Sequence, residues 1–271
     1  MSTPTVALTI AGSDSGGGAG IQADLRAFGR MGAFGASVIT AVTAQNTVGV
    51  SDVHVIPATT VAAQLDAVLG DFTVAAVKTG MLATSTLVEL VAERAEAGAL
   101  PNLVVDPVLV SATGHRLLEE DAIAVYRDRL LPHAIIATPN LEEAAVLVGR
   151  PLTTSEDALA AAHELASLGT PIVVVKGGHL SGDEAIDVVV TREGDEHRLV
   201  AGRIATANTH GTGCTFAAAT AAGLATGSTP LEALQEAKRY VTAAIAGAVD
   251  WRLGAGNGPL DHLGFDAPAA S

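Results

Sequence analysis

The chain opens with Val6-Ala-Leu-Thr-Ile-Ala11, which runs directly into Gly12-Ser-Asp-Ser-Gly-Gly-Gly-Ala-Gly20. The first run is short and continuously apolar, which is typical of a strand buried on both faces. The second run is rich in glycine and predicts a flexible loop, followed by a helix over about residues 21–31. The sequence therefore predicts a central strand, a loop and a helix at the start of the fold.

The same alternation of strand and helix patterns continues along the chain. Further strands are predicted at residues 37–44, 53–56, 74–77, 103–105, 134–137 and 172–175. Helices are predicted at 57–69, 84–97, 141–148, 155–168, 212–226 and 230–248, with a loop and then a helix over 117–130. Residues 184–190 and 196–203 have the pattern of a hairpin. No linker or repeat interrupts the alternation, so we expect a single α/β domain over residues 1–271. It would contain a doubly wound, mostly parallel sheet, helices on both faces and an antiparallel hairpin near one edge.

The composition limits the class of protein. Of the 271 residues, 49% are hydrophobic but only 3% are aromatic, so Val, Leu, Ile and Ala must build the core. The net charge of −14 argues against non-specific binding to nucleic acid or to an anionic membrane, because both need a basic surface. One cysteine allows no intramolecular disulfide, and the N-terminus lacks a basic, apolar leader. We expect a soluble, cytoplasmic protein.

Polar side chains follow most of the predicted strands. Such ends lie at one edge of a doubly wound sheet, where ligands bind. The residues at these ends are Asp14, Gln45, Lys78, Asp106, Asn140 and Lys176.

A second glycine-rich stretch, Asn208-Thr-His-Gly-Thr-Gly-Cys214, precedes an alanine-rich helix. The start of a helix presents unpaired N–H groups and a partial positive charge, and glycines let an anion approach them closely. Cys214 falls in the first turn, where the field of the helix is expected to lower the pKa of its thiol. The alternative is a glycine-rich helix start with a buried, unreactive cysteine.

Charged residues suggest how a phosphate and a metal ion would be held. Lys176 is one of three lysines and lies between a buried strand and Gly177-Gly178, so it can neutralise a transferred phosphate. Asp106 and Glu143 are carboxylates of the kind that hold Mg²⁺, directly or through water. The alternatives are a lysine stem along the surface and a solvated glutamate in a first helical turn. No G-x-x-x-x-G-K-[ST] string is present.

Several of these segments resemble the hydroxymethylpyrimidine/phosphomethylpyrimidine kinases of thiamine biosynthesis, in the order found in that family. The resemblance covers residues 6 to about 250. The segments are Ala7 to Asp24, Thr43-Ala-Gln-Asn46, Val77-Lys-Thr-Gly-Met81, Val105-Asp-Pro-Val108, Thr138-Pro-Asn-Leu-Glu-Glu143, Val175-Lys-Gly-Gly-His179 and Asn208 to Cys214. This family has the ribokinase-like fold, in which most relatives carry Asp where this chain has Cys214. Thr79 stands where Ile is more common.

The resemblance implies ATP- and Mg²⁺-dependent phosphorylation of 4-amino-5-hydroxymethyl-2-methylpyrimidine and then of its monophosphate, by a protein that forms a homodimer. Cys214 would accept the proton of the hydroxymethyl group, Lys176 would hold the phosphate charge, and Gly211, Thr212 and Gly213 would form an anion hole. The substrate pocket would contain Gln45, Gly12, Asp24, Met81 and Val108. The nucleotide would contact Lys176, Asn140, Thr209 and His210, and the metal would lie near Asp106 and Glu143.

Two other functions fit the same residues. Pyridoxal kinase has the same fold and mechanism with a different ring, and the sequence separates the two only weakly. A pyrimidine-binding protein without activity is the second, although Lys176, Cys214, Asp106 and Glu143 all argue for catalysis. Turnover on the pyrimidine, its phosphate and pyridoxal would separate the three.

Overall fold

The computed structural model describes residues 3–109, 120–178 and 182–265. The strands are β1 (Val6–Asp14), β2 (Phe34–Asn46), β3 (Gly49–Val55), β4 (Val74–Thr79), β5 (Val104–Val105), β6 (Ile136–Ala137), β7 (Ile172–Lys176), β8 (Glu184–Thr191) and β9 (Glu196–Gly202). The helices are α1 (Gly20–Arg30), α2 (Ala58–Asp71), α3 (Ser85–Glu96), α4 (Glu120–Val125), α5 (Leu141–Val148), α6 (Ser155–Ser167), α7 (Thr212–Ala225) and α8 (Pro230–Gly247). The start of the helix predicted within 117–130 lies outside the described residues.

In the described part of the chain, nine strands form one sheet in the order β3-β2-β1-β4-β5-β6-β7-β8-β9. The strands from β2 to β7 run parallel, which confirms the predicted sheet. The predicted hairpin is confirmed as β8 and β9, which run antiparallel to each other beside β7.

A second antiparallel pair, β2 and β3, forms the other edge of the sheet and was not predicted. Only Thr47 and Val48 separate the two strands, and Asn46 Oδ1 accepts hydrogen bonds from the amides of Val48 and Gly49 in this turn. Such a short connection forces antiparallel pairing. The predicted third strand began only at residue 53, so the tight turn was hidden.

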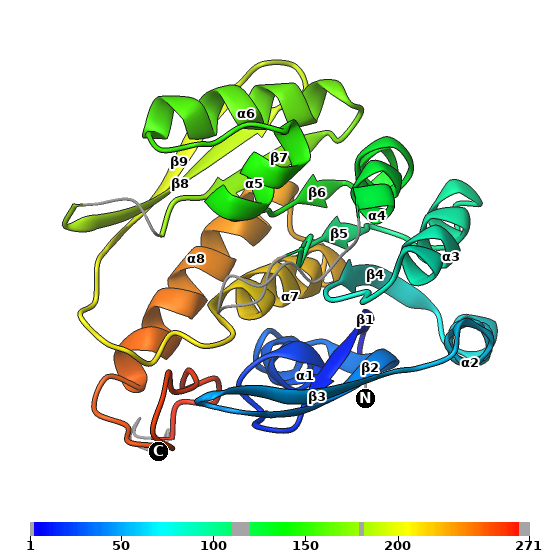
Figure 1. Cartoon of the computed structure of the whole chain (residues 1–271), viewed down its shortest axis with the longest axis horizontal. Helices are drawn as coiled ribbons and strands as arrows, with labels where there is room; N and C mark the ends of the chain where they lie inside the picture. The colour runs from blue at the N-terminus through cyan, green and yellow to red at the C-terminus, as the bar shows by residue number, and fades with distance from the viewer. Residues whose placement is uncertain (1–2, 110–119, 179–181, 266–271) are drawn as a thin grey trace.

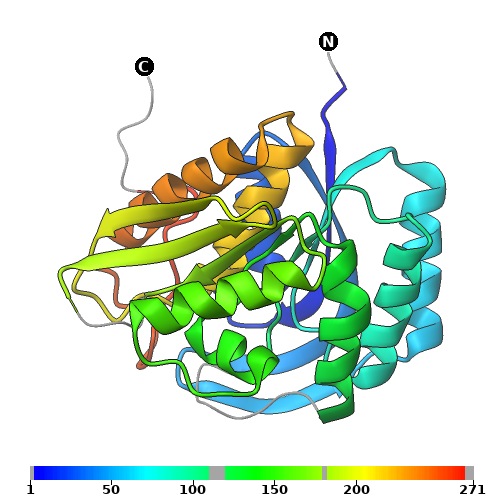
Figure 2. The same cartoon turned by 90° about the horizontal axis from the view of Figure 1, so that it is seen from above.

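Helices cover both faces of the sheet and give three layers (Figures 1 and 2). On one face α1, α7 and α8 bury small and aliphatic side chains, among them Ala7, Ala76 and Ala218. On the other face the larger apolar cluster includes Leu8, Val77 and Tyr126. Alternate residues of β1 and β4 therefore point to opposite layers, as the pleat of a strand requires.

The central helix α7 is buried along nearly its whole length, from Thr215 to Ala225. Its alanine-rich sequence lets it lie close to the sheet and to α8, where a Cβ on Gly223 would come 2.9 Å from the Cβ of Ala233. Close packing on both sides fixes where α7 begins, which is the predicted anion-binding turn.

The sheet has a switch point at β1, whose neighbours are β2 on one side and β4 on the other. The chain leaves β1 toward β2 and β3, then returns to add β4 and the later strands in the opposite direction. Loops diverge at such a point and leave a crevice at the carboxyl ends of the strands, which is where ligands bind in sheets of this type. In the described residues no helix is long and apolar enough to cross a membrane.

Candidate active site

The glycine-rich turn before α7 forms an anion cradle at this crevice. Gly211 is the N-cap of α7 with φ of +87°, a left-handed conformation that strongly favours glycine. A Cβ on Gly211 would also overlap the carbonyl oxygen of Gly18, in the loop after β1. The amide of Thr212 donates to Thr209 O at 3.2 Å, so the next amides, of Gly213 and Cys214, are the ones that an anion could reach.

Lys176 and Asp106 lie beside this cradle. Lys176 Nζ is 2.8 Å from Asp106 Oδ1, and Thr138 Oγ1 donates to the same oxygen at 3.3 Å. A Cβ on Gly213 would come 3.1 Å from Lys176 Nζ and 3.9 Å from Asp106 Oδ2. The ends of β5 and β7 and the start of α7 thus bring a cation, a carboxylate and helix amides together, as the sequence predicted.

Glu143 lies on the other side of Lys176 and caps its own helix. The side chain of Asn140 accepts a hydrogen bond from the Glu143 amide, and Glu143 Oε2 accepts one from the Asn140 amide at 2.7 Å. Burial, reinforced by the charge of Asp106 and opposed by Lys176, raises the pKa of Glu143 to about 8. The alternative of a solvated glutamate is wrong, because Glu143 is buried.

Within the described residues, no group of three or more His, Cys, Asp or Glu side chains is arranged to hold a metal ion. Within these described ranges, Asp106 and Glu143 therefore have no third protein ligand to complete a metal cage. Hard cations such as Mg²⁺ keep several waters and bind through one or two carboxylates plus substrate phosphates, and this donor set fits that mode.

The predicted effect of the helix on Cys214 is not what the structure gives. The backbone amide of Gly20, at the start of α1, donates to the Cys214 sulfur, and Lys78 adds a positive charge nearby. Desolvation outweighs both, and the carboxylates of Asp24 and Asp106 add to it, so the pKa of Cys214 rises to about 11. The prediction of a lowered pKa considered only the helix of Cys214 and left out the burial of the thiol and the carboxylates near it.

Asp24 is buried beneath the crevice and does not line a pocket. Lys78 Nζ lies 2.8 and 2.9 Å from its two carboxylate oxygens, Thr9 Oγ1 donates to it at 2.6 Å, and neither Lys78 nor Asp24 is exposed. The prediction that Asp24 lines the substrate pocket is therefore wrong in this structure. Burial favours neutral Lys78, but the charge of Asp24 prevails and raises the Lys78 pKa.

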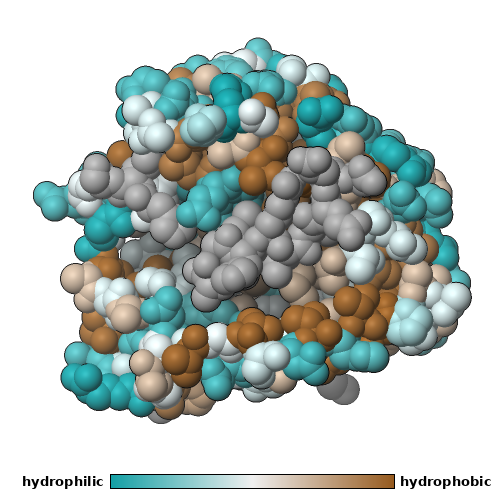
Figure 3. Space-filling model, viewed as in Figure 1, coloured by the Kyte–Doolittle hydropathy of each residue, from teal (hydrophilic) through white to brown (hydrophobic). Residues whose placement is uncertain are grey.

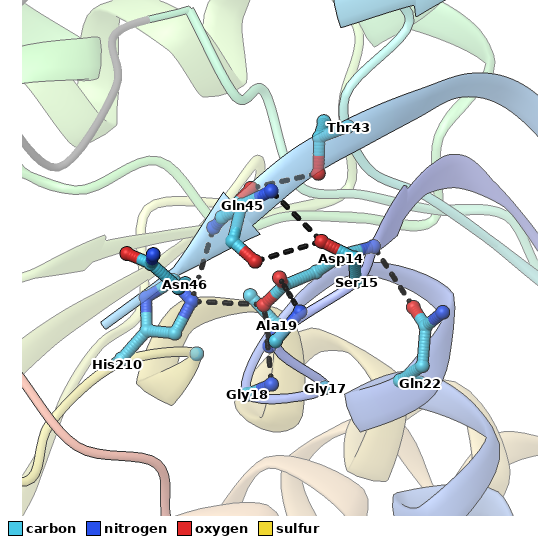
Figure 4. Close-up of polar contacts among 12 residues, drawn as sticks. Asp14, Ser15, Gly17, Gly18, Ala19, Gln22, Thr43, Gln45, Asn46 and His210 are labelled. Carbon is cyan, nitrogen blue, oxygen red and sulfur yellow. Dashed lines mark hydrogen bonds and ion pairs between the residues drawn. The ribbon is translucent and has the colours of Figure 1, made fainter. Parts of the chain in front are cut away.

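Gln45 belongs to a network that links β2, the loop after β1 and the anion cradle (Figure 4). Its amide lies 3.1 Å from His210 Nε2 and 3.1 Å from Thr43 Oγ1, and His210 Nε2 is 2.9 Å from Asp14 Oδ2. Gln45 lies one residue before the end of β2, at the predicted end of the strand, but this part of β2 is not fully buried, since Val42 is 45% exposed. Sequence reasoning did not predict the contact between Gln45 and His210.

The other predicted site residues lie around these groups. A Cβ on Gly12 would come 2.5 Å from Met81 Cε, so these two predicted pocket residues are in contact. Val108 is half-buried, and its amide donates to Asp106 O at 2.9 Å. Thr209 is exposed and lines a groove of about 480 Å³ together with Asp183, Arg203, Ile204, Ala205 and Thr206.

A C-terminal strap, residues 254–262, holds the cradle in place and was not predicted. The His210 amide donates to Gly258 O at 3.1 Å, and the Gly256 amide donates to Thr47 Oγ1 at 3.2 Å. His262 Nε2 lies 2.8 Å from Thr215 Oγ1, in the first turns of α7. Burial lowers the pKa of His262 to about 4, so it is neutral near pH 7. The strap has no periodic pattern, so its sequence carries no signal of these contacts.

Comparison with known proteins gives one consistent result. Residues 14–261 match the family model described as phosphomethylpyrimidine kinase. The chain is 49% identical over 260 residues to a hydroxymethylpyrimidine/phosphomethylpyrimidine kinase from Rhizobium meliloti (strain 1021), covering 95% of this chain and 97% of the relative.

Solved structures show the same fold. An ADP complex of Bacillus subtilis pyridoxal kinase superposes with a TM-score of 0.90 at 38% identity, covering 98% of this chain and 100% of that one. A phosphomethylpyrimidine kinase from Clostridium difficile 630 superposes with a TM-score of 0.78 at 38% identity, covering 89% of this chain and 99% of that one.

Proposed function

Because the chain belongs to the phosphomethylpyrimidine kinase family, we propose that it phosphorylates 4-amino-5-hydroxymethyl-2-methylpyrimidine and then its monophosphate, with ATP as donor, in thiamine biosynthesis. The observation that carries this proposal is the placement of Lys176 Nζ against both Asp106 and the Gly213 turn of α7. A cation beside unpaired helix amides is what a moving phosphoryl group requires.

Phosphoryl transfer depends on positioning and on neutralising charge rather than on covalent catalysis by the protein. Lys176 and the amides of Gly213 and Cys214 would stabilise the equatorial oxygens of the moving group. Cys214 would accept the proton of the substrate hydroxyl. Thr209 and the groove beside it would receive part of the nucleotide, and Asn140 would contact it from the N-cap of α5.

At the other end of the crevice, Gln45 would bind the pyrimidine ring. Its amide offers a donor and an acceptor side by side, which matches an amino group next to a ring nitrogen. Gly12, Met81 and Val108 would pack against the ring.

The test is turnover of purified protein in a coupled ADP assay with three acceptors: the pyrimidine, its monophosphate and pyridoxal. We expect kcat/KM to be highest for the pyrimidine and measurable for its monophosphate. A preference for pyridoxal would assign this chain the activity of its structural neighbour. No turnover with any acceptor would instead favour a binding protein.

Magnesium is part of the same proposal, with Asp106 and Glu143 holding it through water. Chelator should abolish activity and added Mg²⁺ should restore it. Glu143→Gln keeps a helix-capping side chain but cannot lose a proton to become a carboxylate when Mg²⁺ binds, so we expect it to raise the Mg²⁺ concentration for half-maximal activity by about 10- to 100-fold.

The matched control is Asp157→Asn, which removes the carboxylate from the capping box of α6 on the exposed surface. It should leave the Mg²⁺ requirement unchanged. Full activity in excess chelator, or an unchanged Mg²⁺ requirement in Glu143→Gln, would contradict the metal site.

A homodimer in the cytoplasm completes the proposal. The ribbon of β2 and β3 exposes apolar side chains at a sheet edge, namely Val42, Val48, Val50 and Val53. Apolar residues also show along the lower rim of the molecule in Figure 3, where this ribbon lies in Figure 1. Large exposed apolar patches often mark surfaces that contact another protein, and this patch supports contact between two copies of the chain.

A further inference from the structure

The imidazole of His210 lies between a carboxylate and the Gln45 amide (Figure 4). Its Nε2 is 2.9 Å from Asp14 Oδ2 and 3.1 Å from the end of the Gln45 side chain. One ring nitrogen therefore contacts both groups. Such a nitrogen either donates or accepts a hydrogen bond. If one partner can only accept, the nitrogen must be a donor, and the second partner must then face it with an acceptor.

Asp14 settles which role Nε2 plays. Its carboxylate accepts hydrogen bonds from the amides of Gly16, Gly18 and Ala19, at 2.8, 3.1 and 2.9 Å. Burial opposes ionisation, but these bonds and His210 outweigh it, and the pKa of Asp14 lies below its usual value. An ionised carboxylate only accepts, so His210 Nε2 must carry the proton and donate it.

The protonated Nε2 fixes the orientation of the Gln45 amide. An N–H group cannot accept a hydrogen bond, so the Gln45 atom that faces His210 is the amide oxygen. A half turn of the amide exchanges its oxygen and nitrogen with almost no change in shape. The nitrogen then faces Thr43 Oγ1, which can accept from it because its own proton goes to Ser13 O at 3.0 Å.

His210 itself has little freedom to move. A Cβ on Gly18 would come 2.5 Å from the His210 ring, and the same point lies 3.2 Å from Pro259 Cβ. The His210 amide is bonded to Gly258 O in the C-terminal strap. The ring is thus packed between the loop after β1 and the strap, and only 18% of its side chain is exposed.

We propose that His210 is a positioning residue that holds the Gln45 amide in one orientation and so selects rings with an amino donor beside a ring-nitrogen acceptor. This inference rests on the proposed function. The Gln45 oxygen accepts from the 4-amino group and its nitrogen donates to the adjacent ring nitrogen. A ring with the reversed pattern, a 4-oxo group beside a ring N–H, would oppose acceptor to acceptor and donor to donor.

The experiment compares equilibrium binding of the 4-amino pyrimidine and its 4-oxo analogue, without ATP, to wild type and to His210→Leu. Wild type should bind the amino ring more tightly by about 100-fold, roughly tenfold for each of the two mispaired polar groups. Without His210 the amide can turn over, so the ratio should fall about tenfold or more, partly through tighter binding of the oxo ring. The Kd for ATP should stay the same.

Two variants separate positioning from general damage. His210→Gln keeps N–H donors for Asp14 and Gln45 and should restore most of the preference. Gln22→Leu removes a side chain that bonds the Asp14 amide at 2.9 Å and Ser13 Oγ at 2.8 Å, on the side of Asp14 away from the imidazole, and it should keep the wild-type ratio.

An unchanged ratio in His210→Leu would overturn the inference while leaving the proposed function intact. If His210→Leu instead weakens ATP binding and leaves the ratio unchanged, His210 belongs to the nucleotide site, as the family resemblance implied. Failure of wild type to bind either ring would overturn both the inference and the proposed function.

Discussion

Replacing Cys214 by Ser is expected to lower kcat by about 10²- to 10⁴-fold, the usual contribution of a general base, with little change in the Kd of the pyrimidine. Serine keeps the shape of the side chain, so packing against Gly20 should survive. Its hydroxyl, however, is far too weak an acid to supply an anion near neutral pH. Cys214→Asp should recover part of the rate, because a carboxylate can accept the same proton.

The pH dependence follows from the sign of the shift. The base must be deprotonated to act, and desolvation raises the Cys214 pKa to about 11 in the free protein. Since kcat/KM reports the free enzyme, it should keep rising with pH up to about 10 in wild type. In Cys214→Asp it should be nearly flat above neutral pH.

Alkylation provides a measurement of this pKa that is independent of turnover. Cys214 is the only cysteine, so the rate of modification by a thiol reagent reports its thiolate fraction directly. We expect slow modification at pH 7, a rise toward pH 11 and protection by bound pyrimidine. A wild-type kcat in Cys214→Ser would make Cys214 a packing residue. Asp24 could not replace it as the base, because Lys78 and Thr9 bind its carboxylate.

Replacing Gly211 by Ala is expected to lower kcat by about 10²- to 10³-fold, the cost of losing an anion-hole donor. The new Cβ would overlap Gly18 O and would also force alanine to adopt a φ of +87°. The turn can relieve this overlap only by moving away from the loop after β1, and that movement displaces the amides of Gly213 and Cys214 from Lys176.

Gly227 provides the matched control at the other end of α7. It has a similar φ of +97°, but a Cβ there would meet nothing within 4 Å. Gly227→Ala should therefore cost only the conformational strain of about 1–2 kcal/mol, measured by denaturant unfolding, and leave kcat unchanged. Equal kcat values in the two variants would show that the position of the cradle does not limit the phosphoryl transfer.

Much of the fold followed from local patterns. The parallel strands β1, β4 and β7 are apolar runs between helical patterns, and buried parallel strands have that signature wherever they occur. The hairpin of β8 and β9 was equally visible. The pairing of β2 with β3 was not, because β3 is exposed along most of its length, so its first residues gave no apolar run and the two-residue turn before it was missed.

The site was predicted in part. Lys176, Asp106 and the glycines before Cys214 meet as expected, since strand ends and a helix start must converge at one edge of such a sheet. Asp24 was misplaced because a carboxylate in a helix gives no sign of a lysine on a neighbouring strand. Pairing it with Lys78 required the register of Thr9 opposite Lys78, which only the assembled sheet provides.

The sequence by itself determined the order of strands and helices and the residue types at the crevice, because these depend on periodicity and on neighbours in the chain. It also indicated the family, through the resemblance of its motifs. The tertiary structure alone decided the raised pKa of Cys214, the burial of the Asp24–Lys78 pair and the contact of His210 with Gln45. Desolvation and hydrogen-bond partners come from segments far apart in the chain, such as Gln45 and His210, whose positions differ by 165, and no local pattern encodes them.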